Sequence, residues 1–132
     1  MRCLIVDDSP QFLTAARGLL EREGIAVVGF ASTGAQALRR AEELRPDVTL
    51  VDIDLGGESG LDVTRELSQA ARPTPVILIS THAEEDYAGL ITASPAIGFV
   101  PKTALSAQAI RDLLASPGHS ASAAGISGPR GR

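Results

Sequence analysis

Short apolar segments alternate strictly with helical patterns along this chain, and the alternation limits the fold more than any other feature of its sequence. The apolar segments are nearly continuous in hydrophobicity, which is typical of strands that are covered on both faces in a parallel sheet. They comprise Cys3–Val6, Ile25–Phe30, Val48–Val51, Val76–Ile79 and Ile97–Val100. We therefore predict five parallel strands.

The first two helices have clear starting and ending signals. One is predicted over Ser9–Glu23 and stops at Gly24, since a hydroxyl residue favours a helix start and glycine a helix end. The next begins at a capping-box pattern, Thr33 with Gln36. It must end before Pro46, because the residue that precedes a proline is disfavoured in the helical region.

Three further helical patterns follow. The third helix is expected over about Ser59–Ala71. The fourth is expected after a second capping-box pattern, Thr81 with Glu84. The fifth carries the apolar residues Ile110 and Leu113 on one face.

Strict alternation of strand and helix implies right-handed crossovers and a three-layer α/β sandwich. We expect a flavodoxin-like, doubly wound parallel sheet of five strands in the order 2-1-3-4-5, with five helices. Residues 1–116 are predicted to form this one domain, because a chain of 132 residues is long enough for a single core. Residues 117–132 are rich in Ser, Ala, Gly and Pro, which predicts a flexible tail or the stub of a linker.

Bulk properties exclude several classes of function. The formal net charge of -4 argues against direct nucleic acid binding, which usually depends on a basic face. No apolar run is long enough to span a membrane and no signal-peptide pattern opens the chain, so we expect a cytoplasmic protein. The single cysteine, Cys3, lies in an apolar run and is predicted to be a buried core residue rather than a reactive thiol.

Chemistry-bearing residues stand at the carboxyl ends of the predicted strands, where ligands bind in open α/β folds. They are Asp7 and Asp8 after strand 1, Asp52 after strand 3, Ser80 after strand 4 and Lys102 after strand 5. Three neighbouring carboxylates repel one another unless a cation lies between them. Mg²⁺ suits such a site, because it binds a few carboxylates and leaves positions open for phosphate oxygens.

Each residue also has a purely structural interpretation. Asp7 and Asp8 precede a helix start, where acidic residues interact favourably with the helix dipole. Asp52 follows a buried strand, where an aspartate commonly forms a turn. Thr81 is more simply the cap of the fourth helix than a site residue. Only the combination of these carboxylates across neighbouring strands favours a functional site.

Four segments resemble the motifs of response regulator receiver domains of two-component systems, in the order and spacing of that family. They are Leu4–Ser9, Thr49–Asp54, Ile79–Thr81 and Gly98–Lys102. Each motif alone is weak, but four in register at successive strand ends are specific. The stretch after Gly98 also resembles receivers joined to helix-turn-helix DNA-binding domains of the LuxR/NarL type.

The resemblance implies a role for each site residue. Asp52 is expected to accept a phosphoryl group from a partner sensor histidine kinase. Asp8 and Asp52 are expected to bind Mg²⁺ directly, Asp7 through water and Asp54 through its backbone carbonyl. Lys102 is expected to contact the phosphoryl oxygens. Such a domain is not an enzyme in the ordinary sense, since it catalyses only its own phosphorylation and dephosphorylation.

The resemblance also implies a switch. The Ser80 hydroxyl is expected to bind the new phosphoryl group, and the aromatic ring of Phe99 to turn inward behind it. Together they would repack the face formed by the fourth helix, the fifth strand and the fifth helix. This face is the expected output surface, and receivers often form homodimers through it.

The sequence also fits other functions. The Asp52-x-Asp54 pattern also resembles haloacid-dehalogenase-type phosphatases, which use an aspartyl-phosphate and Mg²⁺. A receiver that is never phosphorylated and serves only as an interaction module is a further alternative. Both a stand-alone regulator and the receiver portion of a longer DNA-binding regulator fit the sequence.

Overall fold

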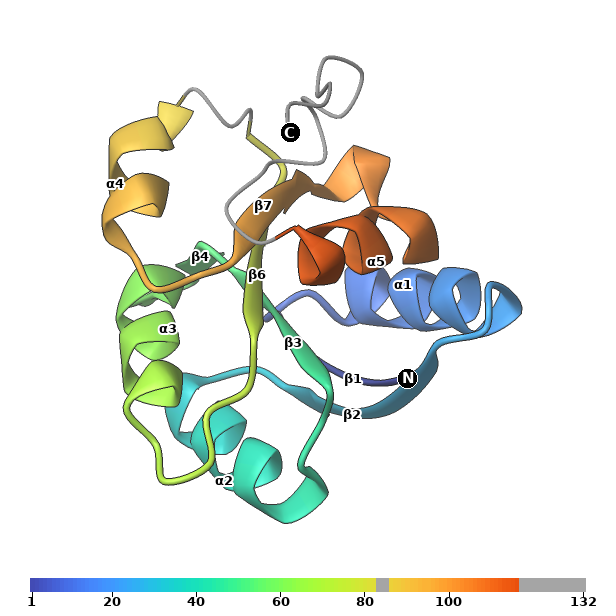
Figure 1. Ribbon diagram of the computed structural model, residues 1–132, viewed down its shortest axis with the longest axis horizontal. Helices are drawn as coiled ribbons and strands as arrows, with labels where there is room; N and C mark the ends of the chain where they lie inside the picture. The colour runs from blue at the N-terminus through green and yellow to red at the C-terminus, as the bar shows by residue number, and fades with distance from the viewer. Residues whose placement is uncertain (83–85, 117–132) are drawn as a thin grey trace.

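A computed structural model describes residues 1–82 and 86–116 of the chain, and these form a parallel sheet with helices on both faces (Figure 1). The strands of this sheet are β1 (Arg2–Val6), β2 (Ala26–Ala31), β3 (Val48–Asp52), β6 (Val76–Ser80) and β7 (Gly98–Pro101). Their order is β2-β1-β3-β6-β7, and every neighbouring pair is parallel. The predicted order 2-1-3-4-5 is thus confirmed.

The helices divide between the two faces of the sheet. Within the described residues they are α1 (Pro10–Arg22), α2 (Gly34–Leu44), α3 (Gly60–Ser68), α4 (Ala88–Ala93) and α5 (Ala107–Ala115). One apolar core joins the sheet to α1 and α5, and a second joins it to α2, α3 and α4 (Figure 1). Along β3, Leu50 belongs to the first core and Val51 to the second, which explains why the strands are apolar throughout.

The predicted starts of the first two helices are largely correct. Ser9 caps α1, its Oγ accepting a hydrogen bond of 3.3 Å from Phe12 N. The Thr33 hydroxyl caps α2 by accepting from Gln36 N at 3.2 Å. The reciprocal half of the capping box forms one residue earlier than expected, because the Gln36 side chain accepts from Ser32 N.

Two later helix predictions need correction. Helix α3 ends at Ser68 rather than near Ala71, with Gln69 as its capping residue. The prediction that Thr81 caps the fourth helix is wrong, since α4 begins at Ala88 and follows Tyr87 without a side-chain cap. Glu84, the other half of that capping-box pattern, and the expected tail at residues 117–132 lie outside the described residues.

A two-stranded hairpin between β3 and α3 was not predicted. Strand β4 (Asp54–Leu55) pairs antiparallel with β5 (Glu58–Ser59). The turn between them uses Gly56 at φ +69°, a left-handed conformation that glycine adopts without a steric penalty. Leu55 is 4% exposed and anchors the hairpin in the core of the α2, α3 and α4 face.

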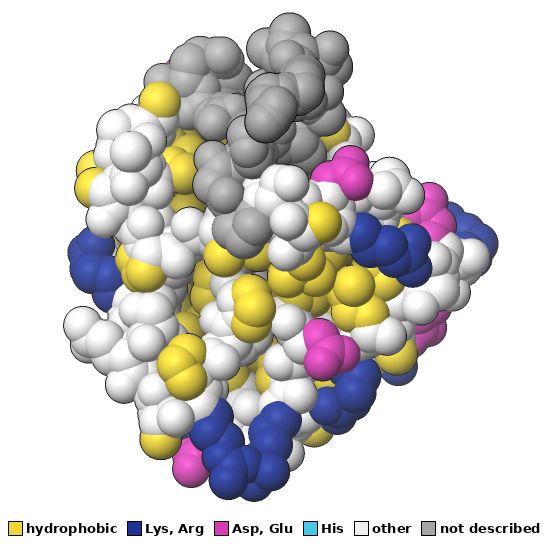
Figure 2. All heavy atoms as spheres, in the orientation of Figure 1, with side chains coloured by type: hydrophobic (Ala, Val, Ile, Leu, Met, Phe, Trp, Pro, Cys, Tyr) yellow, Lys and Arg dark blue, Asp and Glu magenta, His cyan; other side chains and the backbone are white. Residues whose placement is uncertain are grey.

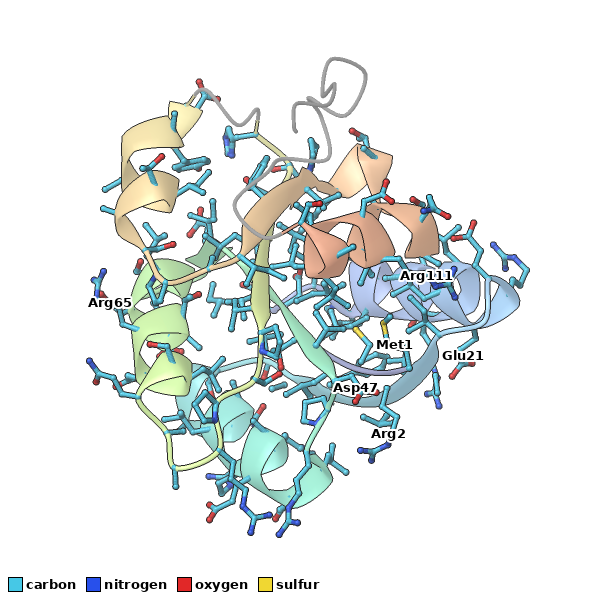
Figure 3. The ribbon with its side chains drawn as sticks, viewed as in Figure 1. Met1, Arg2, Glu21, Asp47, Arg65 and Arg111 are labelled. Carbon is cyan, nitrogen blue, oxygen red and sulfur yellow. The ribbon has the colours of Figure 1, made fainter. Side chains whose placement is uncertain are left out.

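Polar contacts hold the amino end of β1 to the connection between α2 and β3. The Arg2 backbone N–H donates to Asp47 Oδ2 at 2.7 Å, and its guanidinium donates to the carbonyl of Arg45 at 2.9 Å (Figure 3). These contacts lie at the opposite end of β1 from Asp7. Within the described residues, none of the helices is long and apolar enough to cross a membrane.

Cys3 lies in the core, as the sequence predicts, and burial raises the pKa of its thiol to about 12 from an ordinary 9.0. A thiol-specific reagent at pH 8 is therefore expected to label native protein only as fast as it unfolds, and urea-unfolded protein at once. Because the folded pKa is the higher one, stability should also fall as the pH rises from about 9 towards about 12. Rapid labelling of the native protein would contradict the buried placement. Since the chain has one cysteine, the signal has a single source.

Candidate functional site

The register of the sheet brings the predicted carboxylates to one edge. In the β1–β3 pair Val6 lies opposite Val51, so that Asp7 and Asp52 follow at the same level. In the β3–β6 pair Asp52 lies opposite Ile79, which places Ser80 one residue further on. The parallel arrangement therefore gathers these side chains beyond the carboxyl ends of adjacent strands.

In both Asp7 and Asp52, one carboxylate oxygen accepts a local backbone hydrogen bond and the other faces Lys102. Asp7 Oδ1 accepts from Ser9 N at 2.9 Å, and Asp52 Oδ1 accepts from Asp54 N at 3.0 Å. Each Oδ2 instead faces Lys102 Nζ, at 2.6 Å from Asp7 and 2.8 Å from Asp52. In Asp52, Oδ1 thus forms the local turn that the structural interpretation predicts, and Oδ2 takes part in the site shared with Asp7 and Lys102.

Lys102 is the only lysine of the sequence, and it bridges the two buried carboxylates. Burial works to lower the pKa of its ammonium, but hydrogen bonding and attraction from Asp52 and Asp7 outweigh burial and raise it. The ammonium also lies 4.4 Å from the centre of the Phe12 ring, a cation–π contact. Lys102 therefore stays charged at this edge of the sheet.

Asp52 is 5% exposed, and its burial raises the pKa of its carboxyl group. The hydrogen bonds from Lys102 and from the backbone of Asp54 act in the opposite direction, by favouring the ionised form. The nearby charge of Asp7 raises the pKa further. A buried carboxylate with directed donors and a like-charged neighbour is a characteristic of functional sites.

Asp8 completes a cluster that suits a divalent cation. One carboxylate oxygen from each of Asp7, Asp8 and Asp52 lies within 4.8 Å of the others. Asp7 Oδ2 is buried, and among the described residues its partner is the Lys102 ammonium, in an ion pair of 2.6 Å. The combined negative charge of the three carboxylates exceeds the single positive charge of Lys102. The oxygen donors and the remaining negative charge fit Mg²⁺.

Glycines bring the hairpin close to these carboxylates. A Cβ on Gly60 would lie 1.9 Å from the carbonyl oxygen of Asp52, so that only glycine permits this approach. The Gly60 N–H also donates to the carbonyl of Ile53 at 2.7 Å. At the turn, a Cβ on Gly56 would lie 3.0 Å from Asp8 Oδ2. The hairpin turn thus lies against Asp8, and the first residue of α3 lies against the backbone of Asp52.

The predicted switch residues are buried near this edge. Ser80 is 1% exposed, and its hydroxyl accepts a hydrogen bond of 3.0 Å from His82 N. Phe99 is fully buried and belongs to the core under α2, α3 and α4. Its ring therefore already faces inward in this structure. His82 and Thr81 are exposed.

Sequence reasoning missed three contributors: Phe12, Glu58 and Gly60. Phe12 packs partly buried against the core that α1 and α5 share, and its ring also contacts the Lys102 ammonium. Glu58 binds the amino end of α2, 24 residues away in sequence. A glycine soon after Asp52 could have indicated a close backbone approach at Gly60. No sequence pattern predicts the contact of Phe12 with Lys102 or that of Glu58 with α2.

A pocket of about 310 Å³ lies elsewhere, at the carboxyl ends of α2 and α3. Its wall includes Leu38, Leu67, Arg45 and Arg72, and none of the predicted site residues. In Figure 2, basic side chains gather at the lower edge of the molecule, over α2. The carboxylate cluster and this pocket are therefore separate features.

Comparison with known proteins identifies the family to which these features belong. Residues 3–115 match the family described as the response regulator receiver domain. This chain is a response regulator receiver domain. The match is with receivers and not with the dehalogenase-type phosphatases considered as an alternative.

The similarity of this receiver domain to individual proteins agrees with the family match. It is 32% identical to the response regulator GacA of Pseudomonas viridiflava, covering 84% of this chain and 52% of the relative. It is 30% identical to the DNA-binding transcriptional activator EvgA of Escherichia coli K12, covering 77% of this chain and 50% of the relative. The receiver domain thus spans about half the length of these curated relatives.

A solved structure shows the same fold. The receiver domain superposes with a TM-score of 0.80 on a LuxR-family two-component response regulator from Aurantimonas sp. SI85-9A1. The two are 31% identical, and the match covers 90% of this chain and 87% of the other. The flavodoxin-like receiver fold is therefore confirmed by an independent structure.

Proposed function

We propose that this receiver domain accepts a phosphoryl group on Asp52 from a phosphohistidine of a sensor histidine kinase. The observation that carries the proposal is the state of the Asp52 carboxylate. It is nearly buried, and both of its oxygens accept directed hydrogen bonds, one from Lys102 and one from the Asp54 backbone. A carboxylate held in this way is oriented for attack before the donor arrives.

The reaction is an in-line displacement at phosphorus. A carboxylate oxygen of Asp52 attacks the phosphorus, an O–P bond forms, and the N–P bond to the donor imidazole breaks. The released electron pair stays on the imidazole nitrogen, which takes a proton from solvent. The Lys102 ammonium stabilises the negative charge of the phosphoryl oxygens during transfer.

A Mg²⁺ ion belongs to the proposed site. Asp8 and Asp52 would bind it directly, Asp7 through water and Asp54 through its backbone carbonyl. When bound, the ion supplies positive charge that reduces repulsion between the carboxylates and the incoming phosphoryl group. The cluster of three carboxylate oxygens, whose negative charge exceeds what Lys102 alone can balance, supports this assignment.

Signal output is proposed to involve Ser80 and Phe99. The Ser80 hydroxyl would leave His82 N and bind the phosphoryl group, and Phe99 would repack beneath the face formed by α4, β7 and α5. A homodimer through this face, a cytoplasmic location and an output domain that binds DNA stay predictions. The division of the chain into a domain of residues 1–116 and a tail of residues 117–132 also stays a prediction.

The test is phosphorylation by acetyl phosphate with Mg²⁺, followed on a phosphate-affinity gel. Wild-type protein is expected to shift, and Asp52→Asn is expected to remain unmodified, because an amide is not a competent nucleophile. Asp62→Asn makes the same chemical change at an exposed position on α3 and should behave as wild type. Excess chelator should also prevent the shift in wild type.

Two outcomes would contradict this proposal. Modification that persists in Asp52→Asn would place the phosphoryl group elsewhere. An unmodified wild-type protein, with acetyl phosphate and with a histidine kinase as donor, would instead favour the alternative of an unphosphorylated interaction module.

A further inference from the structure

Glu58 joins the hairpin that follows Asp52 to the amino end of α2. Its Oε1 accepts a hydrogen bond of 2.8 Å from the backbone N–H of Gly34, the first residue of α2. The first N–H groups of a helix have no partner inside the helix. Thr33 supplies partners for the Gln36 and Ala37 N–H groups through its side chain and carbonyl. Glu58 therefore satisfies a donor that the local cap leaves free.

The absence of a side chain at Gly34 leaves room for this contact. A Cβ at this position would lie 2.7 Å from Glu58 Oε2 and 3.0 Å from a methyl group of Val63. Any larger residue would thus have to displace the carboxylate or the side chain from α3. A carboxylate at a helix amino end is also favoured by the helix dipole. The glycine and the glutamate form a complementary pair, although they are 24 residues apart.

The hairpin that Glu58 holds carries two contacts to the phosphorylation site. Asp54, on its first strand, donates its N–H to Asp52 Oδ1 at 3.0 Å. Gly56, at its turn, lies against the carboxylate of Asp8. The hairpin is fixed at its base by Gly60 and in the core by Leu55. Glu58 attaches the second strand of the hairpin, β5, to the amino end of α2.

We propose that Glu58 is a positioning residue that holds the hairpin against α2 and so places the Asp54 backbone and the Gly56 turn for Mg²⁺ binding. This inference rests on the proposed function, because it assigns Glu58 an effect on the same metal site. Glu58 is itself exposed, so its hydrogen bond contributes little to global stability. Its removal therefore affects metal binding more than folding.

The experiment measures Mg²⁺ affinity by isothermal titration calorimetry in the full chain. Glu58→Ala is expected to weaken binding about tenfold, since residues that orient metal ligands typically contribute about 10–100-fold to affinity. Glu58→Gln keeps a carbonyl oxygen that can accept from Gly34 N, so it should retain most of the affinity. A loss caused only by removing a negative charge near the metal would be equal in the two variants.

A matched control lies on the other face of the sheet. Glu23 makes the same kind of contact, its Oε1 accepting from the N–H of Ala107, the first residue of α5, at 2.7 Å. Glu23→Ala should leave Mg²⁺ affinity unchanged. Hydrogen exchange provides a readout without metal: the Asp54 amide should exchange faster in Glu58→Ala, but not in Glu58→Gln or Glu23→Ala.

The outcomes separate the two proposals. If wild-type protein binds Mg²⁺ and Glu58→Ala binds it equally well, the positioning role is overturned while the proposed function stands. Equal losses in Glu58→Ala and Glu58→Gln would also overturn it, in favour of a charge effect. If wild-type protein binds no Mg²⁺, the proposed function fails and the positioning role fails with it, whatever the exchange data show.

Discussion

Replacing Lys102 with methionine is expected to lower the free energy of unfolding by about 3 kcal/mol in metal-free buffer at neutral pH, because it removes one partner of a buried ion pair. Methionine keeps the length and apolar character of the lysine stem, so packing against Phe12 is largely preserved. The substitution leaves Asp7 and Asp52 buried without a counter-charge. Urea unfolding with chelator present measures the loss.

The pH dependence of this loss has a definite sign. The folded pKa of Asp52 already lies above its ordinary value of 3.8 because of burial, and Lys102 acts to lower it. Without Lys102 it should rise further, so that the folded protein takes up a proton more readily than the unfolded chain. The loss of stability is then full above the folded pKa of Asp52 and shrinks as the pH falls through it.

Added Mg²⁺ and a conservative substitution serve as controls for this prediction. Mg²⁺ should stabilise Lys102→Met more than wild type, since the ion replaces the missing positive charge. Lys102→Arg keeps the charge and should lose much less stability. A Lys102→Met protein as stable as wild type in metal-free buffer at neutral pH would show that the carboxylate pair does not need the ammonium.

Gly60→Ala is expected to destabilise the protein by about 2–3 kcal/mol, within the range for overpacking a tightly packed position. The new Cβ would lie 1.9 Å from the Asp52 carbonyl oxygen and 2.8 Å from its carbonyl carbon. These neighbours are backbone atoms, which cannot move aside as the end of a flexible side chain can. Because the strand end carrying Asp52 must shift, acetyl phosphate should also modify the variant more slowly than wild type.

Gly57→Ala is the matched control for Gly60→Ala. It lies in the same segment, and within residues 1–82 and 86–116 a Cβ there would meet no atom within 4 Å apart from its chain neighbours. Its unfolding midpoint and its modification by acetyl phosphate should remain close to those of wild type. A Gly60→Ala protein with wild-type stability and modification rate would contradict the close contact with the Asp52 backbone.

Local patterns explain why most of the fold was predictable. Continuous apolar runs such as Val48–Val51 indicate strands covered on both faces, and alternation with helices then limits the topology to a few arrangements. Thr33 and Pro46 marked the ends of α2 because capping and proline geometry act within a few residues. The start of α4 at Ala88 was missed, since Tyr87 provides no side-chain cap to mark it.

The sequence by itself determined the order of the sheet and the presence of Asp7, Asp8, Asp52, Ser80 and Lys102 at its carboxyl edge. These follow from periodicity and from the common direction of parallel strands, which are local or topological properties. Tertiary structure alone decided which carboxylate oxygen faces Lys102, that Phe12 contacts its ammonium, and that Glu58 reaches Gly34. Those contacts join residues far apart in sequence, and their distances, burial and pKa shifts arise only when packing brings the segments together.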